Sequence, residues 1–486
     1  MHYLFVKNAK KSLKFSRGYA ILTMKKNGRV GSGEGKDMER FTSFAEMLGY
    51  WAEKAPAHPA LRYDERCLSF AELTTEIAGR ADALRAEGKS CLGVLCDGSM
   101  DCVLTIFAAV RAGRQVVLLD AALPEEQLPG LIAYADIDSL WCGEEPCPVG
   151  ESAFTTGVTD GAGRILFFTS GTTERSKAVV LTEKSLCASA WNGASMLPLS
   201  SDDTLLGILP LGHVFGFVCG LLWGLSCGAC VALGRGARHY MDDFAFYQPS
   251  AVSLVPQLLG FLLRGGFLNE ELKLVLVGAG DCPPSLLHAA SDKGLRVSFG
   301  YGLTETSSGV AISTGGDPFA MDICPDDTIT LAPDGEILIE APTCLMQEYY
   351  KREADTAAAV IDGVLHSGDL GSFDPDGRLH ITGRKKDMLV LGDGTKIFLP
   401  EYEAGIQQAL GKTELAAALH NGRPVLVVKA EESERAALEG AVREFNRTLP
   451  RGQQITRIQI IHEPLPRTAT GKIRRWAIRI TEEEKA

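Results

Sequence analysis

The chain has 486 residues, of which 45% are hydrophobic and 23% are charged, and its net charge is −12. These values are typical of a soluble protein with more than one domain, and the acidic balance argues against nucleic acid as the main partner. No apolar run is long enough for a membrane helix. The thirteen cysteines are scattered, and Cys227 and Cys230 lack the further ligands of a zinc site. We therefore expect reduced thiols in a cytoplasmic protein.

The first 37 residues form a basic N-terminal extension with nine lysines or arginines. They contain no continuous apolar core, which a secretory signal needs. Three interpretations of residues 1–37 stay open: a disordered extension, a chain that starts at Met38, or a basic segment in peripheral contact with a membrane surface.

Predicted strands and helices alternate through most of the chain that follows. Ser69 and Glu72 form a capping box at the start of one helix, and Gly113 stands where a helix C′ residue is expected. The strand–helix–strand order indicates βαβ units and largely parallel sheets. The expected helices cover residues 41–54, 69–87, 101–112, 214–225 and 256–263, and the expected strands cover 92–95, 116–119, 165–168, 178–181, 205–210, 230–233, 252–255, 272–277 and 297–298.

The pattern changes to short strands and turns after about Leu331, which predicts a small β-rich subdomain. Beyond a charged neck at 383–387, strands over 415–419, 425–428 and 458–461 and a helix over 431–445 indicate a separate domain. We therefore expect an α/β protein with two domains. The large N-terminal domain, 38–385, has parallel-rich sheets packed with helices plus the β-rich subdomain, and the small mobile C-terminal α+β domain covers 386–486.

A polar loop between two strand-like runs is the strongest candidate for binding a polyphosphate. Gly171 allows close approach of the backbone, Lys177 adds a positive charge, and four hydroxyls can donate to phosphate oxygens. These hydroxyls belong to Thr169, Ser170, Thr172 and Thr173. A Walker A loop is excluded because Ser176 and Ala178 stand where it requires glycine and a hydroxyl. An ordinary hydroxyl-rich turn stays open as the alternative.

The segment Gly300-Tyr-Gly-Leu-Thr-Glu-Thr306 is the second candidate site. Its glycines permit a tight turn that exposes the ring of Tyr301 for stacking on a base. Thr304 can reach phosphate, and Glu305 is a hard oxygen ligand suited to Mg²⁺. A surface loop with an acidic tip is the alternative.

Two later segments carry weaker signals of their own. Asp369 follows Ser367-Gly, and a carboxylate after glycine can hold both hydroxyls of a ribose, although a lone Gly-Asp is also a common turn. Residues 466–474, Pro-Arg-Thr-Ala-Thr-Gly-Lys-Ile-Arg, are basic and by themselves are typical of a solvated tail.

Together these segments resemble the acyl-adenylate-forming superfamily, which includes acyl-CoA synthetases, adenylation domains of peptide synthetases and luciferases. The matches run in order over residues 41–477. The first loop resembles the phosphate loop of that superfamily, but Glu174 and Ala178 replace common glycines and Ser176 replaces a common proline. The resemblance implies the adenylate-forming enzyme fold.

The resemblance also implies a role for each candidate residue. ATP would be held by the loop residues Thr169, Ser170, Gly171, Thr172, Thr173 and Lys177, by Gly278, Ala279, Gly280 and Tyr301 around adenine, and by Asp369 and Arg384. Thr304 and Glu305 would act at the reacting phosphates, with Glu305 as the metal ligand. Lys386 matches the hinge, His213 matches an acyl-site residue or is merely structural, and Lys472 matches the catalytic lysine.

The activity implied by the resemblance is that of an acid–thiol ligase. It would use ATP and Mg²⁺ to adenylate a small-molecule carboxylic acid and would transfer the acyl group to coenzyme A. Residues 216–222 carry no charge, so we expect a fatty or other apolar acid. Two alternatives stay open: loading of an acyl carrier protein, and a homologue that has lost catalysis and only binds nucleotide.

Overall fold

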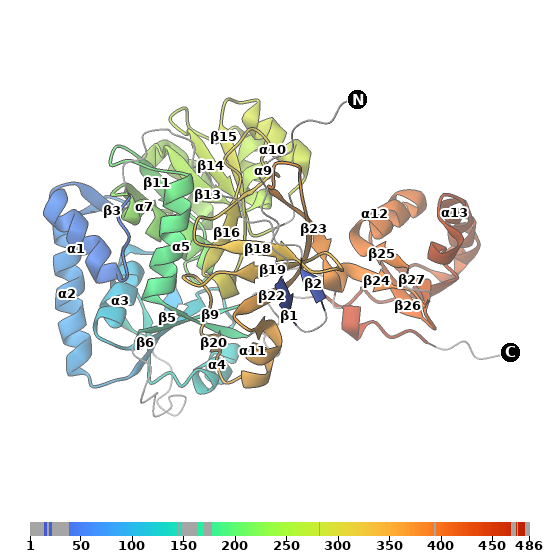
Figure 1. The fold of residues 1–486 in the computed structure, drawn as a ribbon, viewed down its shortest axis with the longest axis horizontal. Coiled ribbons are helices and arrows are strands. Elements are labelled where there is room, and N and C mark those ends of the chain that lie inside the picture. Colours follow the sequence, from blue (N-terminus) through green and yellow to red (C-terminus); the bar gives the residue numbers. More distant parts are fainter. Residues whose placement is uncertain are drawn as a thin grey trace. The chain divides into compact units, whose positions relative to one another are not determined.

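The computed structural model describes residues 14–16, 19–21, 38–143, 145–147, 163–169, 177–280, 282–392, 395–467, 473 and 475–481. Contacts divide the chain into two compact units, which Figure 1 shows. The first contains residues 1–367 and 372–380, and the second contains residues 368–371 and 381–486. None of the helices in the described ranges combines the length and the hydropathy that a membrane span needs.

Two mixed sheets form the framework of the first unit. The seven-stranded sheet has the order β20-β10-β9-β6-β5-β7-β8, and the nine-stranded sheet has the order β17-β16-β15-β14-β13-β11-β12-β3-β4. Pairing is parallel through the centre of both sheets, which confirms the predicted α/β fold. The bounds in the first sheet are Cys91–Cys96 (β5), Gln115–Asp120 (β6), Ser139–Cys142 (β7), Glu145–Pro146 (β8), Arg164–Phe168 (β9), Ala178–Thr182 (β10) and Glu348–Tyr349 (β20). Those in the second are Pro59–Tyr63 (β3), Arg66–Ser69 (β4), Thr204–Gly207 (β11), Cys230–Leu233 (β12), Ala251–Leu254 (β13), Leu274–Val277 (β14), Arg296–Leu303 (β15), Ser308–Ile312 (β16) and Asp322–Ile323 (β17).

Two helices lie between these sheets (Figure 1). Helix α3 (Met100–Arg111) contacts β5 and β3, and α5 (Glu183–Met196) contacts β10 and β16. Burial on both sides explains why α3 is apolar around nearly its whole circumference. The predicted capping box of α2 (Phe70–Ala86) is confirmed, because Ser69 and Glu72 exchange side-chain and backbone hydrogen bonds.

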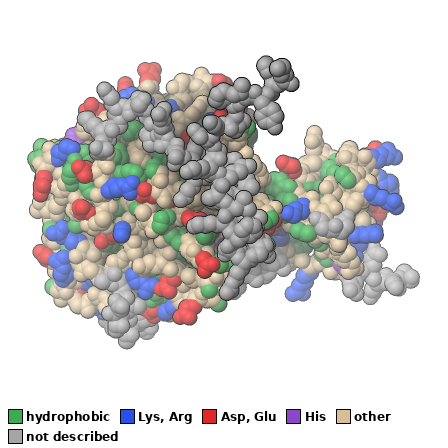
Figure 2. Space-filling view, in the orientation of Figure 1, with side chains coloured by type: hydrophobic (Ala, Val, Ile, Leu, Met, Phe, Trp, Pro, Cys, Tyr) green, Lys and Arg blue, Asp and Glu red, His purple; other side chains and the backbone are tan. Residues whose placement is uncertain are grey.

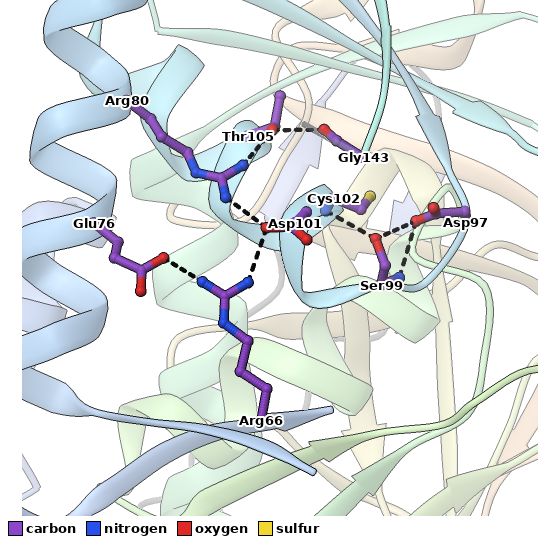
Figure 3. A network of polar contacts seen from close by, with 9 residues as sticks. All are labelled: Arg66, Glu76, Arg80, Asp97, Ser99, Asp101, Cys102, Thr105 and Gly143. Atoms are coloured by element: carbon purple, nitrogen blue, oxygen red, sulfur yellow. Dashed lines mark hydrogen bonds and ion pairs between the residues drawn. The ribbon is translucent and has the colours of Figure 1, made fainter. Parts of the chain in front are cut away.

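A polar network joins α2 and α3 to the edge strand β4, and Figure 3 shows it from close by. The Asp101 carboxylate accepts from Arg66 at 3.2 Å and from Arg80 at 2.5 Å, and Arg66 also reaches Glu76 at 2.6 Å. These side chains are partly exposed, so each pair contributes only about 0–1 kcal/mol. The network therefore adds little to stability, to which the buried apolar side chains of α2 and α3 contribute more.

The helix expected over 214–225 is interrupted by a wider turn. It consists of α6 (Val214–Phe217), a π-helical segment over Val218–Leu222 and α7 (Trp223–Ser226). A π-helical turn inside a helix is frequent at functional sites. The remaining helices of the first unit are α1 (Phe44–Lys54), α4 (Leu128–Tyr134), α8 (Tyr240–Tyr247), α9 (Pro256–Gly265), α10 (Pro284–Ser291) and α11 (Glu353–Ala359).

The β-rich region forms a third sheet with the order β18-β19-β22-β21, and β23 also pairs with β22. Its strands are Thr328–Leu331 (β18), Glu336–Glu340 (β19), Val360–Ile361 (β21), Val364–Phe373 (β22) and Leu379–Arg384 (β23). The short strands Lys14–Ser16 (β1) and Tyr19–Ile21 (β2) pair with each other. On the face of the larger unit seen in Figure 2, acidic and basic side chains are interspersed.

The second unit has its own core around a three-stranded sheet, β26-β27-β28. Its elements are Met388–Val390 (β24), Lys396–Phe398 (β25), Leu399–Leu410 (α12), Leu415–His420 (β26), Arg423–Lys429 (β27), Arg435–Arg447 (α13) and Arg457–Ile461 (β28). Residues from both helices and from the sheet contribute to this core, which makes the unit a compact α+β body.

Candidate active site

The two ends of the predicted phosphate loop are tied together where β9 ends and β10 begins. The Thr169 amide donates to the Lys177 carbonyl at 2.9 Å, and the Lys177 amide donates to the Thr169 hydroxyl at 3.1 Å. These bonds continue the antiparallel pairing of β9 and β10, so Thr169 and Lys177 lie side by side. The loop residues Ser170, Gly171, Thr172 and Thr173 lie outside the described residues.

The Lys177 side chain points toward an acid and an aromatic ring. Its ammonium lies 3.6 Å from the Asp355 carboxylate and 4.1 Å from the centre of the Tyr349 ring. The side chain is about a third exposed, so the charge can also reach a ligand. An ammonium held over an aromatic face is a stable arrangement that fixes the direction of a flexible side chain.

Glu305 lies in a tight turn whose shape depends on its neighbours. A Cβ atom at Gly302 would lie 1.7 Å from the Ser308 carbonyl oxygen, so only glycine fits there. The Thr306 hydroxyl donates to the carbonyls of Leu303 and Ser308 and closes the turn. Ser308 has φ 115°, a conformation that costs free energy and is common at functional sites.

The Glu305 carboxylate is held by Tyr349. The tyrosine hydroxyl donates to Oε1 at 2.6 Å, and the Glu305 carbonyl accepts from the Met346 amide at 2.7 Å. Burial, and then the negative charge of Glu305, raise the pKa of Tyr349, so its hydroxyl keeps its proton. Among the described residues no lysine, arginine or histidine forms an ion pair with Glu305.

An uncompensated, partly exposed carboxylate of this kind fits a divalent cation. Mg²⁺ prefers oxygen ligands and is often held by one or two carboxylates together with substrate phosphates. In the described part of the chain, no group of three or more histidine, cysteine, aspartate or glutamate side chains forms a metal cage. The Glu305 carboxylate could therefore serve as one ligand of a divalent cation whose other ligands are substrate phosphates.

Tyr301 and Thr304 precede Glu305 in the chain. The ring of Tyr301, which the sequence predicts to be exposed, is only 8% exposed, so that prediction is wrong. The tyrosine belongs to β15, and its pairing with Ala311 in β16 turns it into the fold. Thr304 begins the turn of Thr304–Thr306 and is partly exposed.

His213 and the glycine-rich segment lie near two sheet ends. His213 precedes α6, and its Nε2 lies 3.9 Å from the Asp120 carboxylate at the end of β6. Gly278, Ala279 and Gly280 follow β14, and a Cβ at Gly278 would meet the Phe215 ring at 3.1 Å. Ala279 has φ 60°, so this segment turns sharply after the strand. Both lie beyond the carboxyl ends of parallel strands, where α/β proteins bind ligands.

Asp369 and Arg384 form a pair within the second unit. Arg384 Nε lies 3.1 Å from the Asp369 carboxylate, which is nearly buried, whereas the guanidinium is about half exposed. Gly368, with φ 70°, provides the turn before the acid. Lys386, the expected hinge residue, is exposed in the turn Lys385–Asp387.

Lys472 lies outside the described residues, but the chain on both sides of it is anchored. Arg467 and Ile473 form an isolated β-bridge, which brings the two ends of this segment together. Arg467 pairs with Glu414 at 2.7 Å, and Arg475 contacts both oxygens of Glu403 at 2.6 and 2.7 Å.

The structure thus brings Lys177 and Glu305 together in the first unit, and Asp369 and Arg384 in the second. The sequence analysis did not identify Tyr349, the residue that connects Lys177 with Glu305, or Asp355. The sequence carried no local signal for them, because Tyr349 approaches Lys177 only through the pairing of β20 with β10, in which it lies opposite Val179.

Known proteins resemble this chain over most of its length. A family model described as AMP-binding enzyme matches residues 48–155 and 163–350. An indoleacetate–CoA ligase of Aromatoleum aromaticum is 27% identical over 90% of this chain and 97% of its own length. A 2-succinylbenzoate–CoA ligase of Bacillus cytotoxicus is 28% identical over 81% of this chain and 89% of its own length.

Solved structures show the same fold. The O-succinylbenzoate coenzyme A synthetase of Bacillus subtilis in complex with AMP has a TM-score of 0.74 at 22% identity, covering 90% of this chain and 98% of that one. An anthranilate CoA ligase in complex with anthranoyl-AMP has a TM-score of 0.71 at 19% identity, covering 90% and 97%. These four proteins are named for aromatic acids, whereas the sequence analysis expected a fatty or other apolar acid. The predicted family is confirmed: the chain belongs to the AMP-binding enzyme family.

Proposed function

We propose that this chain is an ATP-dependent acid–CoA ligase that adenylates an apolar carboxylic acid and transfers the acyl group to coenzyme A. The observation that carries the proposal is the convergence of Lys177 and Glu305 on one side chain, Tyr349. A cation for phosphates and a carboxylate for Mg²⁺, placed around one point, is an arrangement suited to Mg-ATP. Relatives of this chain are CoA ligases, which supports the thiol acceptor.

The reaction has two steps. A carboxylate oxygen of the acid attacks the α-phosphorus of ATP, the bond to the bridging oxygen breaks, and pyrophosphate leaves. The thiol of coenzyme A then attacks the carbonyl of the acyl-AMP, loses its proton, and AMP leaves. Both steps depend on positioning and on neutralising charge, so no protein nucleophile is needed.

In the first step we assign Lys177 and the loop hydroxyls to the phosphates that leave as pyrophosphate. Glu305 would hold Mg²⁺, which when bound neutralises charge on the phosphates. Asp369 would accept from the ribose hydroxyls, Arg384 would contribute a second nucleotide contact, and Lys472 would approach the reacting carboxylate. Rotation of the second unit near Lys386 would then withdraw Lys472 before the thiol enters.

The acid would contact the face of the interrupted helix that is not buried. From Val214 to Ser226 only Phe215 and Cys219 are partly exposed, and they are four residues apart, so they share one face. Cys219 Sγ lies 3.4 Å from the Ser308 hydroxyl. A phenyl ring, a thiol and a hydroxyl offer no charge for an amino or dicarboxylic acid. An apolar acid therefore fits, and the names of the relatives support an aromatic acid over a fatty one.

The test is acid-dependent exchange between ATP and labelled pyrophosphate, with aryl, arylacetic, amino and fatty acids of increasing length. Exchange with one acid class, followed by thioester formation on adding coenzyme A, is the expected result. Exchange without a coenzyme A thioester would instead favour an acyl carrier protein as the acceptor. Absence of exchange with every acid would contradict the proposal and favour a homologue that only binds nucleotide.

A further inference from the structure

Tyr349 contacts both charged groups assigned to Mg-ATP. Its hydroxyl donates to Glu305 Oε1 at 2.6 Å, and its ring centre lies 4.1 Å from the Lys177 ammonium. Glu305 and Lys177 come from different sheets, since Lys177 precedes β10 and Glu305 follows β15. One side chain therefore links the two sheets at the point where the nucleotide phosphates are expected.

The tyrosine itself is firmly held. It is 5% exposed, and its strand β20 pairs with β10 at Val179 and Val180. Its amide donates to the Thr356 hydroxyl at 2.9 Å, which connects it to α11. A buried ring on a paired strand has little rotational freedom, so it can define the position of groups that contact it.

We propose that Tyr349 is a positioning residue for Mg-ATP, whose hydroxyl orients the metal-binding carboxylate of Glu305 and whose ring directs the ammonium of Lys177. This inference rests on the proposed function and names a residue that it leaves unassigned. Because the Tyr349 hydroxyl holds Oε1 of Glu305, the other carboxylate oxygen, Oε2, keeps a fixed orientation. The ring, together with Asp355 at 3.6 Å from the ammonium, holds the Lys177 ammonium in place until a phosphate of ATP replaces the Asp355 carboxylate.

The next residue in the chain provides a matched control. The Tyr350 hydroxyl donates to Asp136 Oδ2, also at 2.6 Å, and Tyr350 is 4% exposed. A lysine, Lys351, lies 5.3 Å from the centre of its ring. Both tyrosines thus combine a hydroxyl–carboxylate bond with a nearby ammonium. Among the described residues, none of those that we assign to ATP forms a hydrogen bond, ion pair or ring contact with Tyr350.

The experiment compares Tyr349→Phe, Tyr349→Leu and Tyr350→Phe in the full chain. The probes are Mn²⁺, observed by electron paramagnetic resonance, and α,β-methylene-ATP, which cannot release pyrophosphate. Two dissociation constants are measured: that of the analogue without metal, and that of Mn²⁺ with the analogue saturating. Thermal unfolding of each variant reports the structural cost.

Tyr349→Phe is expected to weaken Mn²⁺ binding roughly tenfold, on the scale of a hydrogen bond to a charged group, while analogue binding without metal is retained. Tyr349→Leu is expected to weaken both, because the ring is lost as well. Tyr350→Phe should lower the unfolding temperature about as much as Tyr349→Phe does, because each variant loses one hydroxyl–carboxylate hydrogen bond. Both dissociation constants of Tyr350→Phe should stay within about twofold of wild type.

Equal Mn²⁺ affinities in Tyr349→Phe and Tyr350→Phe would overturn the role of the hydroxyl. Equal analogue affinities in Tyr349→Phe and Tyr349→Leu would overturn the role of the ring. These measurements need no acid and no turnover, so they are independent of the exchange assay. A wild-type protein that binds Mn²⁺ and the analogue but exchanges with no acid would contradict the proposed function and leave this inference standing.

Discussion

Tyr349, the last residue of β20, and Tyr350, which directly follows it, make the same kind of bond on opposite faces of the chain. Each donates its hydroxyl to a carboxylate at 2.6 Å, and each is at least nine-tenths buried. Successive side chains of a strand point to opposite faces, and the two rings accordingly belong to different hydrophobic cores. The difference lies in the carboxylates that they hold.

Asp136 is already neutralised, whereas Glu305 is not. Lys351 Nζ lies 2.6 Å from Asp136, so that acid, the lysine and Tyr350 form a complete structural group. In the described part of the chain, no side-chain cation pairs with Glu305. A carboxylate that is held in place but not neutralised is suited to receive a cation from outside. Asp136 and Glu305 therefore differ in one respect that mutation can test: a described cation pairs with Asp136 and none pairs with Glu305.

The largest effect on ATP–pyrophosphate exchange is expected from a substitution of Glu305, and Asp136 serves as its control. Glu305→Gln should reduce ATP–pyrophosphate exchange by roughly a hundredfold, because a neutral amide is a poor ligand for Mg²⁺. Asp136→Asn should lower the unfolding temperature and leave exchange within about twofold. Exchange measured at several Mg²⁺ concentrations checks both. If the two variants lost exchange equally, the missing partner charge would not distinguish the two carboxylates.

The lysines beside the two tyrosines, Lys177 and Lys351, are expected to differ in their effect on the KM for ATP. Lys177→Met should raise the KM for ATP by about tenfold or more, since one charged contact to phosphate is lost. Lys351→Met retains every contact that we assign to ATP, so its KM should stay near that of wild type. Steady-state exchange kinetics with varied ATP give both values. A rise in KM for Lys351→Met would contradict the structural role of the Asp136 group.

A third acid, the buried Asp327, extends the comparison to a carboxylate without a tyrosine donor. Asn192 Nδ2 donates to its Oδ2, but among the described residues Oδ1 of both side chains lacks a partner. Burial raises the pKa of Asp327 to about 7. The folded state therefore holds this proton more tightly than the unfolded state, and stability falls as the pH rises from about 4 to about 7.

Asp327→Asn should remove this pH dependence and supply a donor for the Asn192 oxygen. We expect the variant to be more stable than wild type at pH 8 by about 1–2 kcal/mol, and by less at pH 4.5, where Asp327 is protonated in the folded protein. Urea unfolding at the two pH values measures the difference. A stabilisation of equal size at both pH values would show that ionisation of Asp327 is not its cause.

The smallest effect is expected from a position remote from the candidate site. Ser69→Ala removes the cap of α2 and should cost about 1 kcal/mol of unfolding free energy. Because α2 carries none of the candidate residues, Mn²⁺ binding and exchange should not change. This variant shows how much a simple loss of stability contributes to each assay, and a change in Mn²⁺ affinity would weaken the interpretation of the larger effects.

Much of the fold could be predicted because its elements carry strong local patterns. The expected strands over 92–95, 116–119 and 252–255 are observed as β5, β6 and β13 with shifts of one residue at their ends. Helix α5 was not predicted, although it lies between the two sheets. Its buried face contains Ser185, Ser189 and Asn192, and such polar residues conceal the apolar periodicity on which prediction depends.

The candidate site was predicted as residue types and not as an arrangement. The sequence by itself determined the family and the motif residues, since a loop with a distinctive order of residue types, such as Thr169 to Lys177, can be recognised without coordinates. Only the tertiary structure decided that Tyr349 links Lys177 with Glu305, that Tyr301 is buried and that Asp327 lacks a donor for Oδ1 among the described residues. The physical reason is that strand pairing and sheet packing join residues that are far apart in the chain, and no local pattern records which side chains meet.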